Sequence, residues 1–222
     1  MDQNSSDQPP FAPVSVSTGP SLTDITPASE YSDLQEREYK NDPKYKKYAF
    51  ALDKILTSFE VEDWHDIIPF LGKIYKIIVQ HPQFPNVPKK AEIFKRLGQA
   101  LNQNLPSGVH QKALDVYTVI FERIGSEKLL KRIPMFSYAL FSFFEYATMS
   151  VKPVILNIYE RFFIPLGKNL RICLKDFLLG ILPALEEEGN EFFEKVVLVC
   201  CLPYSAITSK NDIIRPFNYL II

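Results

Sequence analysis

The sequence predicts an all-α protein, a helical-hairpin array that resembles a HEAT- or armadillo-type α-solenoid, preceded by a disordered N-terminal tail. From Asp42 onward, apolar residues recur with helical spacing, and no window alternates as a half-buried strand does. Short breaks separate the helical windows, which favours antiparallel packing of neighbouring helices. The dipeptide Ile-Pro recurs at 68–69, 133–134 and 164–165 without a fixed period, so an irregular helical bundle is the alternative.

Residues 1–41 differ in composition from the rest of the chain. They contain seven acidic and two basic residues, a net charge of −5, which leaves +4 for residues 42–222 of a chain whose total is −1. Their prolines and small polar residues bury too little apolar area to offset the entropy lost on ordering. We expect a disordered, solvated tail, with a phosphorylatable or partner-binding arm as the alternative.

The overall composition narrows the class of protein. A net charge near zero gives no indication of nucleic acid as a partner. The three cysteines, Cys173, Cys200 and Cys201, are odd in number and two are adjacent, which favours a reducing compartment over a disulfide framework. The N-terminus does not read as a signal peptide, and the longest apolar stretches are shorter than the roughly 20 residues of a membrane span. We expect a soluble protein.

The first two helices are expected within residues 42–59 and 62–81. Asp63 can cap the second, and Asp66 in its first turn is favoured by the helix dipole. Pro69 lies too deep for the first turn, so it should kink this helix or delay its regular part. The expected buried residues are Tyr45, Tyr48, Ala49, Leu52, Ile55, Leu56 and Phe59 in the first helix and Ile67, Phe70, Leu71, Ile74 and Ile78 in the second.

Further helices follow the proline-rich loop 81–88. Pro88 is expected in the first turn of a helix that continues to Leu101. Pro165 and Gly167 should interrupt the helical pattern later in the chain. The remaining helical windows are 105–125, 126–148, 151–167, 169–188 and 190–200.

The window 105–125 holds Ser107, His110 and Asp115, which raises the question of a catalytic triad. In a helix, Asp115 lies about 140° around the axis from His110 and cannot reach its imidazole, so we reject this reading. A structural reading accounts for the same stretch. Ser107 is expected to cap the helix, and Gly125 to end it in a left-handed conformation. The face expected to be buried comprises Val109, Ala113, Tyr117, Ile120, Phe121 and Ile124.

No other pattern indicates catalysis. The three histidines have no metal-ligand spacing with each other or with the cysteines, and no glycine-rich stretch has the spacing of a phosphate loop. The basic stretches 44–48 and 87–96 are solvated helix faces or, alternatively, surfaces for an anionic membrane or an acidic peptide. We therefore expect no enzyme, no cofactor and no metal site.

Four stretches, taken in order, resemble the N-terminal domain of the Dopey family. The most specific are "LPSGVHQKALDVY" and "SVKP…IYERFFIPLG", and the resemblance covers about residues 44–198. We expect a Dopey-like helical domain at 42–199 and a divergent end at 200–222 that is truncated or irregular. The family-motif positions, with a structural or interaction role, are Trp64, Ser107, Gly108, His110, Lys112, Lys152, Pro153, Tyr159, Glu160, Pro165, Leu166 and Gly167.

The resemblance implies a function that the residues alone do not. Dopey proteins are large cytosolic scaffolds, peripheral on trans-Golgi network and endosome membranes, without known catalytic activity. Their partners include a large Arf-exchange-factor-like Golgi scaffold and, by lineage, lipid flippases or sorting machinery. The alternative is a stand-alone helical-repeat module that binds proteins or peptides and is unrelated to membranes. Because residues 196–202 are apolar, we also expect self-association through an open C-terminal end.

Overall fold

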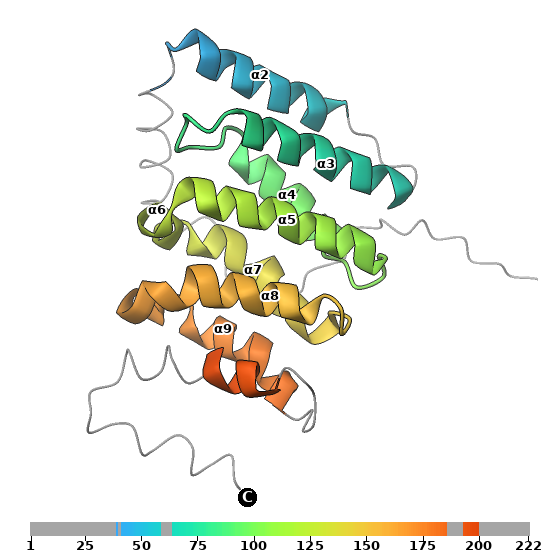
Figure 1. Cartoon of the computed structure of the whole chain (residues 1–222), viewed down its shortest axis with the longest axis vertical. Coiled ribbons are helices and arrows are strands. Elements are labelled where there is room, and N and C mark those ends of the chain that lie inside the picture. Colours follow the sequence, from blue (N-terminus) through green and yellow to red (C-terminus); the bar gives the residue numbers. More distant parts are fainter. Residues whose placement is uncertain (1–38, 40, 59–63, 186–192, 200–222) are drawn as a thin grey trace, which may run out of the picture.

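The computed structural model describes residues 39, 41–58, 64–185 and 193–199, and every regular element in these ranges is helical (Figure 1). The predicted all-α class is therefore confirmed. The disordered tail expected at 1–41 lies outside the described residues, apart from Tyr39 and Asn41. The divergent end expected at 200–222 lies wholly outside them.

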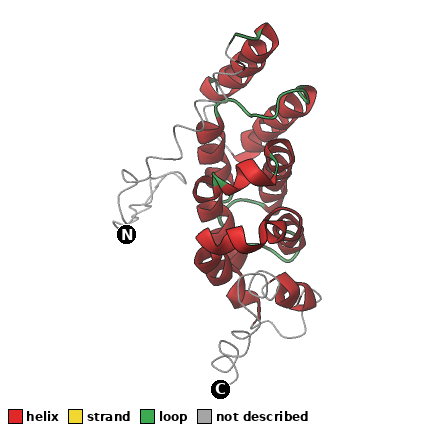
Figure 2. Cartoon of the chain, turned by 90° about the vertical axis from the view of Figure 1, so that its left-hand side faces the viewer, coloured by secondary structure: helices red, strands yellow, loops and turns green. Residues whose placement is uncertain are grey.

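The longer helices form two layers that run along the long axis of the molecule. One layer contains α2 (Pro43–Thr57), α3 (Trp64–Gln80), α5 (Ser107–Ile124) and α8 (Lys152–Ile158), each packed on the next. The other contains α4 (Lys90–Ala100), α7 (Ile133–Phe143) and α9 (Leu174–Ile181). Figure 2 shows the layers as two columns of helices. This stacking is compatible with the expected solenoid.

Shorter elements connect the two layers. The windows expected as single helices at 126–148 and 151–167 are each divided. At Gly167 the backbone adopts φ 53° and ψ −125°, which no helix contains, so the expected break at this glycine is confirmed. The short elements are α6 (Ser126–Leu130), the 3-10 helices η2 (Phe144–Tyr146), η4 (Ile164–Ile172) and η5 (Leu182–Leu185), the π-helix η3 (Tyr159–Phe163) and a helical stretch at 193–199.

Local signals fix the start of α2. The Asp42 carboxylate accepts hydrogen bonds from the main-chain N–H groups of Lys44 and Tyr45, at 2.7 and 3.4 Å. Pro43 occupies the first turn, where its missing N–H costs nothing. The expected stripe packs against α3, and its fully buried members are Tyr45, Tyr48, Leu52 and Leu56.

Two predicted helix starts are wrong, and both have a backbone cause. α4 begins at Lys90 rather than at Pro88, because Lys89 has a left-handed conformation (φ 54°, ψ 26°) that cannot belong to a right-handed helix. Ser107 does not cap α5. The extended N-cap residue is Pro106, whose carbonyl oxygen accepts the first helical hydrogen bonds, so Ser107 lies inside the helix and its hydroxyl makes no cap bond.

Other expectations about helix ends have mixed outcomes. Asp63, the expected cap of α3, lies outside the described residues. α3 runs through Pro69, while Asp66 is in its first turn as expected. Gly125 ends α5 with the expected positive φ of 75°, but its ψ of 163° falls outside the left-handed helical region. The expected buried face of α5 is confirmed, since all six of its residues are buried.

Aromatic rings fill the core between the layers. Phe121 of α5 lies 5.4 Å from Phe136 of α7 and 5.7 Å from Phe163 of η3, measured between ring centroids. Phe141 of α7 continues the cluster to Phe177 of α9 at 5.3 Å. Edge-to-face pairs of this kind add to the stabilisation from burial. These contacts fix the layers relative to each other and so position the surfaces described below.

Candidate functional site

The structure does not bring Ser107, His110 and Asp115 together as a triad. Nε2 of His110 lies 2.8 Å from the main-chain carbonyl oxygen of Asn102, in the loop that precedes α5. The imidazole also packs against the ring of Phe143 at 4.6 Å. The Asp115 carboxylate instead pairs with Lys112 of its own helix at 3.2 Å. His110 therefore joins a loop to the core.

The two motif lysines lie against aromatic rings. Nζ of Lys112 is 5.1 Å from the ring centroid of Tyr75 in α3. Nζ of Lys152 is 5.9 Å from that of Phe144, and Lys152 is almost fully buried at the start of α8. Such cation–π contacts stabilise the positions of both the cation and the ring. Both lysines thus connect neighbouring helices.

The motif around η3 and η4 also holds elements together. Burial raises the pKa of Tyr159 well above its usual value, so its hydroxyl stays protonated and acts as a donor. The Glu160 carboxylate pairs with Lys195 at 3.0 Å, which links η3 to the helical stretch 193–199. Leu166 is buried. A side chain at Gly167 would meet no atom within 4 Å, so its positive φ, rather than lack of space, favours glycine there.

The remaining motif residues lie nearer the surface. Trp64 is 37% exposed and stacks on His65, with ring centroids 3.5 Å apart. Gly108 and Pro165 are exposed, whereas Pro153 is half-buried in the first turn of α8. The motif is therefore spread over the array and does not converge on one cavity.

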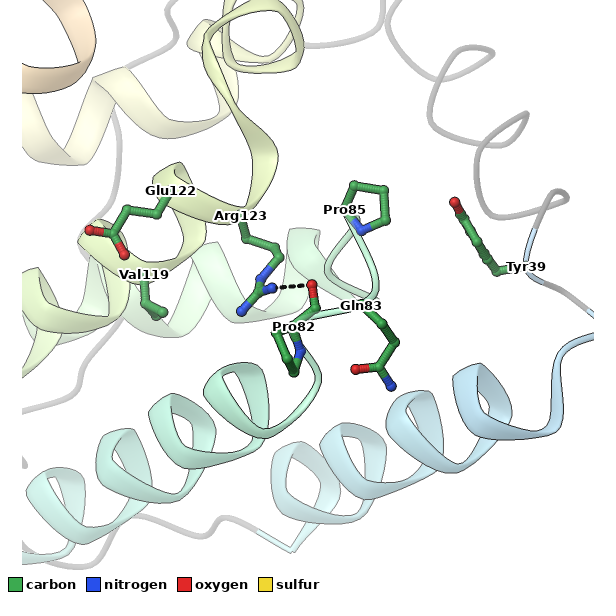
Figure 3. Close-up of a pocket in the computed structure, with 7 residues that line it drawn as sticks. All are labelled: Tyr39, Pro82, Gln83, Pro85, Val119, Glu122 and Arg123. Atoms are coloured by element: carbon green, nitrogen blue, oxygen red, sulfur yellow. Dashed lines mark hydrogen bonds between the residues drawn. The ribbon is translucent and has the colours of Figure 1, made fainter.

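The structure reveals a groove that no pattern in the sequence predicts. It has a volume of about 580 Å³ and lies between the loop after α3, the last turns of α5 and Tyr39, four residues before α2 (Figure 3). Its walls combine apolar rings with polar groups. The lining residues are Tyr39, Pro82, Gln83, Pro85, Val119, Glu122 and Arg123.

Arg123 connects α5 to the end of α3 at this groove. Its guanidinium donates hydrogen bonds to the carbonyl oxygens of Pro82 and Ile78, the latter at 3.3 Å. These contacts satisfy carbonyl groups at and beyond the C-terminal end of α3, where a positive charge is also favoured by the helix dipole. Glu122 forms an ion pair with Arg161 at 2.7 Å. The groove thus places polar groups of fixed orientation beside apolar rings. This arrangement suits the binding of a peptide segment better than the catalysis of a reaction.

A second surface is formed by the outer side of α2. Lys46, Lys47, Phe50 and Lys54 fall within an arc of about 100° on this helix, and all four are exposed. We call these four residues the lysine face. The Phe50 side chain is 69% exposed. Within the described part of the chain, no carboxylate pairs with its three ammonium groups.

Two kinds of site are absent from the part of the chain that the structure describes. No three His, Cys, Asp or Glu side chains gather there in a way that could hold a metal ion. Among the same residues, no helix has both the length and the apolar character to cross a bilayer.

Comparison with known proteins decides the family. The family model described as Dopey, N-terminal, matches residues 42–209. The chain belongs to the Dopey family. Its relatives include Protein DOP1B of Mus musculus, 43% identical over 164 residues, and Protein DOP1 of Saccharomyces cerevisiae, 34% identical over 158 residues. These alignments cover 73% and 68% of this chain but only 7% and 9% of the relatives, and no solved structure matches.

The Dopey match confirms the family that the sequence predicts. The domain bounds of 42–199 stay a prediction. A second animal relative, Protein pad-1 of Caenorhabditis elegans, is 41% identical over 157 residues. That alignment covers 70% of this chain and 6% of the relative, so the chain spans less than a tenth of the length of these relatives.

Proposed function

We propose that this Dopey domain is a non-catalytic scaffold or adaptor in protein and membrane trafficking between the Golgi and endosomes. The proposal rests on one observation, that the polar motif residues contact other parts of the same chain. His110, Tyr159 and Glu160 make contacts within the chain that hold loops and helices in place. A motif used for rigidity suits an array that presents surfaces to partners.

Membership of the Dopey family supports the setting that we propose. The domain works in the cytoplasm, peripheral on membranes of the trans-Golgi network and endosomes. Its proposed partners are a large Arf-exchange-factor-like Golgi scaffold and, through it, lipid flippase or sorting machinery. The groove beside Arg123 is the surface we assign to a protein partner, because it combines apolar rings with oriented polar groups.

Affinity capture tests this assignment. The tagged chain should retain the Arf-exchange-factor-like scaffold from a cell extract, and Gln83→Arg should reduce that capture because it places bulk and charge in the groove. Gln103→Arg is the matched control, since Gln103 is exposed but does not line the groove. Equal capture by both variants would show that the groove is not the partner surface.

The same groove supports a second candidate function, a stand-alone peptide-binding module unrelated to membranes. A hollow of about 580 Å³ is large enough for several side chains of an extended peptide. The two functions predict different molecules bound to the tagged chain after affinity capture. Peptides captured in a Gln83-dependent way, without any membrane-trafficking partner, would favour the module.

We also propose self-association through the last described helices. Ile172, Leu179 and Leu198 are 68%, 58% and 47% exposed, and all three belong to this end of the array. Sedimentation at micromolar concentrations should show species larger than a monomer, and Leu179→Glu should reduce them. Val79→Glu is the control, because Val79 is 45% exposed on the distant helix α3. A monomer at all concentrations would contradict this proposal.

A further inference from the structure

The lysine face of α2 has the chemistry of a binding surface for an acidic chain. Its three lysines share one side of the helix with Phe50, whose side chain is 69% exposed. A single exposed phenylalanine is ordinary on a protein surface. Here it stands among cations that have no ion-pair partner in the described part of the chain. Such a surface favours a ligand that carries several carboxylates and a few apolar side chains.

The chain itself carries a segment of this composition directly before α2. Residues 24–38 contain five acidic residues and one arginine, a net charge of −4. Ile25, Tyr31 and Leu34 provide apolar side chains between the charges. These fifteen residues lie outside the part of the chain that the structure describes.

The point at which this segment joins the domain is fixed beside α2. The ring of Tyr39 lies 5.7 Å from that of Tyr45 in α2 and 5.5 Å from that of Phe84 in the following loop. α2 has 15 residues and is therefore about 22 Å long. An extended chain covers about 3.3 Å per residue, so residues 24–38 can run along the whole helix.

We propose that residues 24–38 dock across the lysine face of α2. The carboxylates face Lys46, Lys47 and Lys54, and apolar side chains of the segment cover Phe50. The tether through Tyr39 gives the segment an effective concentration in the millimolar range.

The expected strength of the contact is modest and depends on salt. Three exposed ion pairs together favour the docked over the undocked form by about tenfold. The Debye length falls from about 10 Å at 0.1 M salt to about 3 Å at 1 M, so salt weakens the contact. Phosphorylation of Thr26, Ser29 or Ser32 adds negative charge to the segment and should tighten it.

Lysine acetylation of the full chain, followed by mass spectrometry, tests the proposal. At low salt, Lys46, Lys47 and Lys54 should react several-fold more slowly than Lys44. Lys44 is the matched control because it is exposed and nearer to the tether, but points to a different side of α2. The difference should disappear at high salt. It should also disappear when Asp24, Glu30, Asp33, Glu36 and Glu38 are replaced together by their amides.

A carbodiimide, which joins amines to carboxylates in contact, identifies the occupant. Lys46, Lys47 and Lys54 should cross-link to carboxylates of residues 24–38, with a several-fold higher yield than Lys44. Equal reactivity of all four lysines in the unmodified chain and the amide variant would overturn the proposal. A higher cross-link yield at Lys44, which of the four lysines lies nearest to Tyr39 in the sequence, would also overturn the proposal. Either result would leave the lysine face open to an external anionic surface such as a membrane.

Discussion

The hydroxyl of Tyr159 donates a hydrogen bond to the main-chain carbonyl oxygen of Leu140, 3.1 Å away and buried. This bond joins η3, which directly follows α8, to α7 in the other layer. The Tyr159 ring also packs against Phe177 of α9, with ring centroids 5.0 Å apart. A single motif residue in η3 thus contacts both α7 and α9.

Tyr159→Phe should lower the free energy of unfolding by about 1 kcal/mol, because it removes one buried hydrogen bond and keeps the ring. Tyr159→Ala should cost about 3–5 kcal/mol, since it also leaves a cavity. Urea denaturation measures both, with Tyr146→Phe as the control because Tyr146 is 55% exposed. If Tyr159→Phe matched the control, the hydrogen bond to Leu140 would contribute nothing.

Ser107→Ala should change the free energy of unfolding by less than about 0.5 kcal/mol, because its hydroxyl makes no cap bond. Tyr117→Ala on the same helix should cost about 3 kcal/mol or more, since the ring is 1% exposed. Thermal melts of the two variants compare these effects. A loss of about 1 kcal/mol in Ser107→Ala would indicate that this serine caps α5 after all.

Two helical glycines facing α7 should respond in opposite directions to alanine. A Cβ at Gly180 of α9 would clash with the main-chain carbonyl oxygen of Phe141, so Gly180→Ala should cost about 1–3 kcal/mol. A Cβ at Gly98 of α4 would lie 3.4 Å from that of Ala139, and alanine favours a helix by up to about 1 kcal/mol over glycine. Gly98→Ala should therefore be neutral or stabilising. Denaturation curves that rank the two variants the other way would contradict this packing.

The protein should lose stability in alkaline solution, partly through Cys173. Burial, helped by the charge of Asp176, raises the pKa of this thiol to about 12. Above a pH of about 8.5 the unfolded chain releases this proton while the folded chain keeps it, so stability falls as pH rises from there to about 12. The free energy of unfolding should decline less steeply between pH 8 and 10.5 in Cys173→Ala. Identical slopes would show that the thiol ionises equally well in both states.

Much of the fold follows from spacing in the sequence. The buried stripe of α2 and the buried face of α5 are local properties of a helical period, and the structure confirms both. The starts of α4 and α5 could not be predicted in this way. They depend on the backbone of Lys89 and Pro106. A positive φ is rare for lysine, and proline has no side-chain acceptor that would mark it as a helix cap.

The candidate surfaces also differ in how far the sequence predicts them. The basic character of α2 and the position of Phe50 outside its buried stripe are visible in the sequence, although the 69% exposure of that side chain is not. The groove joins Tyr39 and the loop after α3 to Val119 and Arg123. Residues so far apart in the chain meet only through the stacking of helices, so no local pattern could reveal them.

The cellular location of the tagged chain tests the proposal that it is a trafficking scaffold. We predict that a fluorescent fusion of the 222-residue chain concentrates on trans-Golgi network and endosome membranes. Gln83→Arg should shift it to the cytosol, whereas Gln103→Arg should leave it in place. A wild-type fusion spread evenly through the cytosol, unchanged by either substitution, would contradict the account.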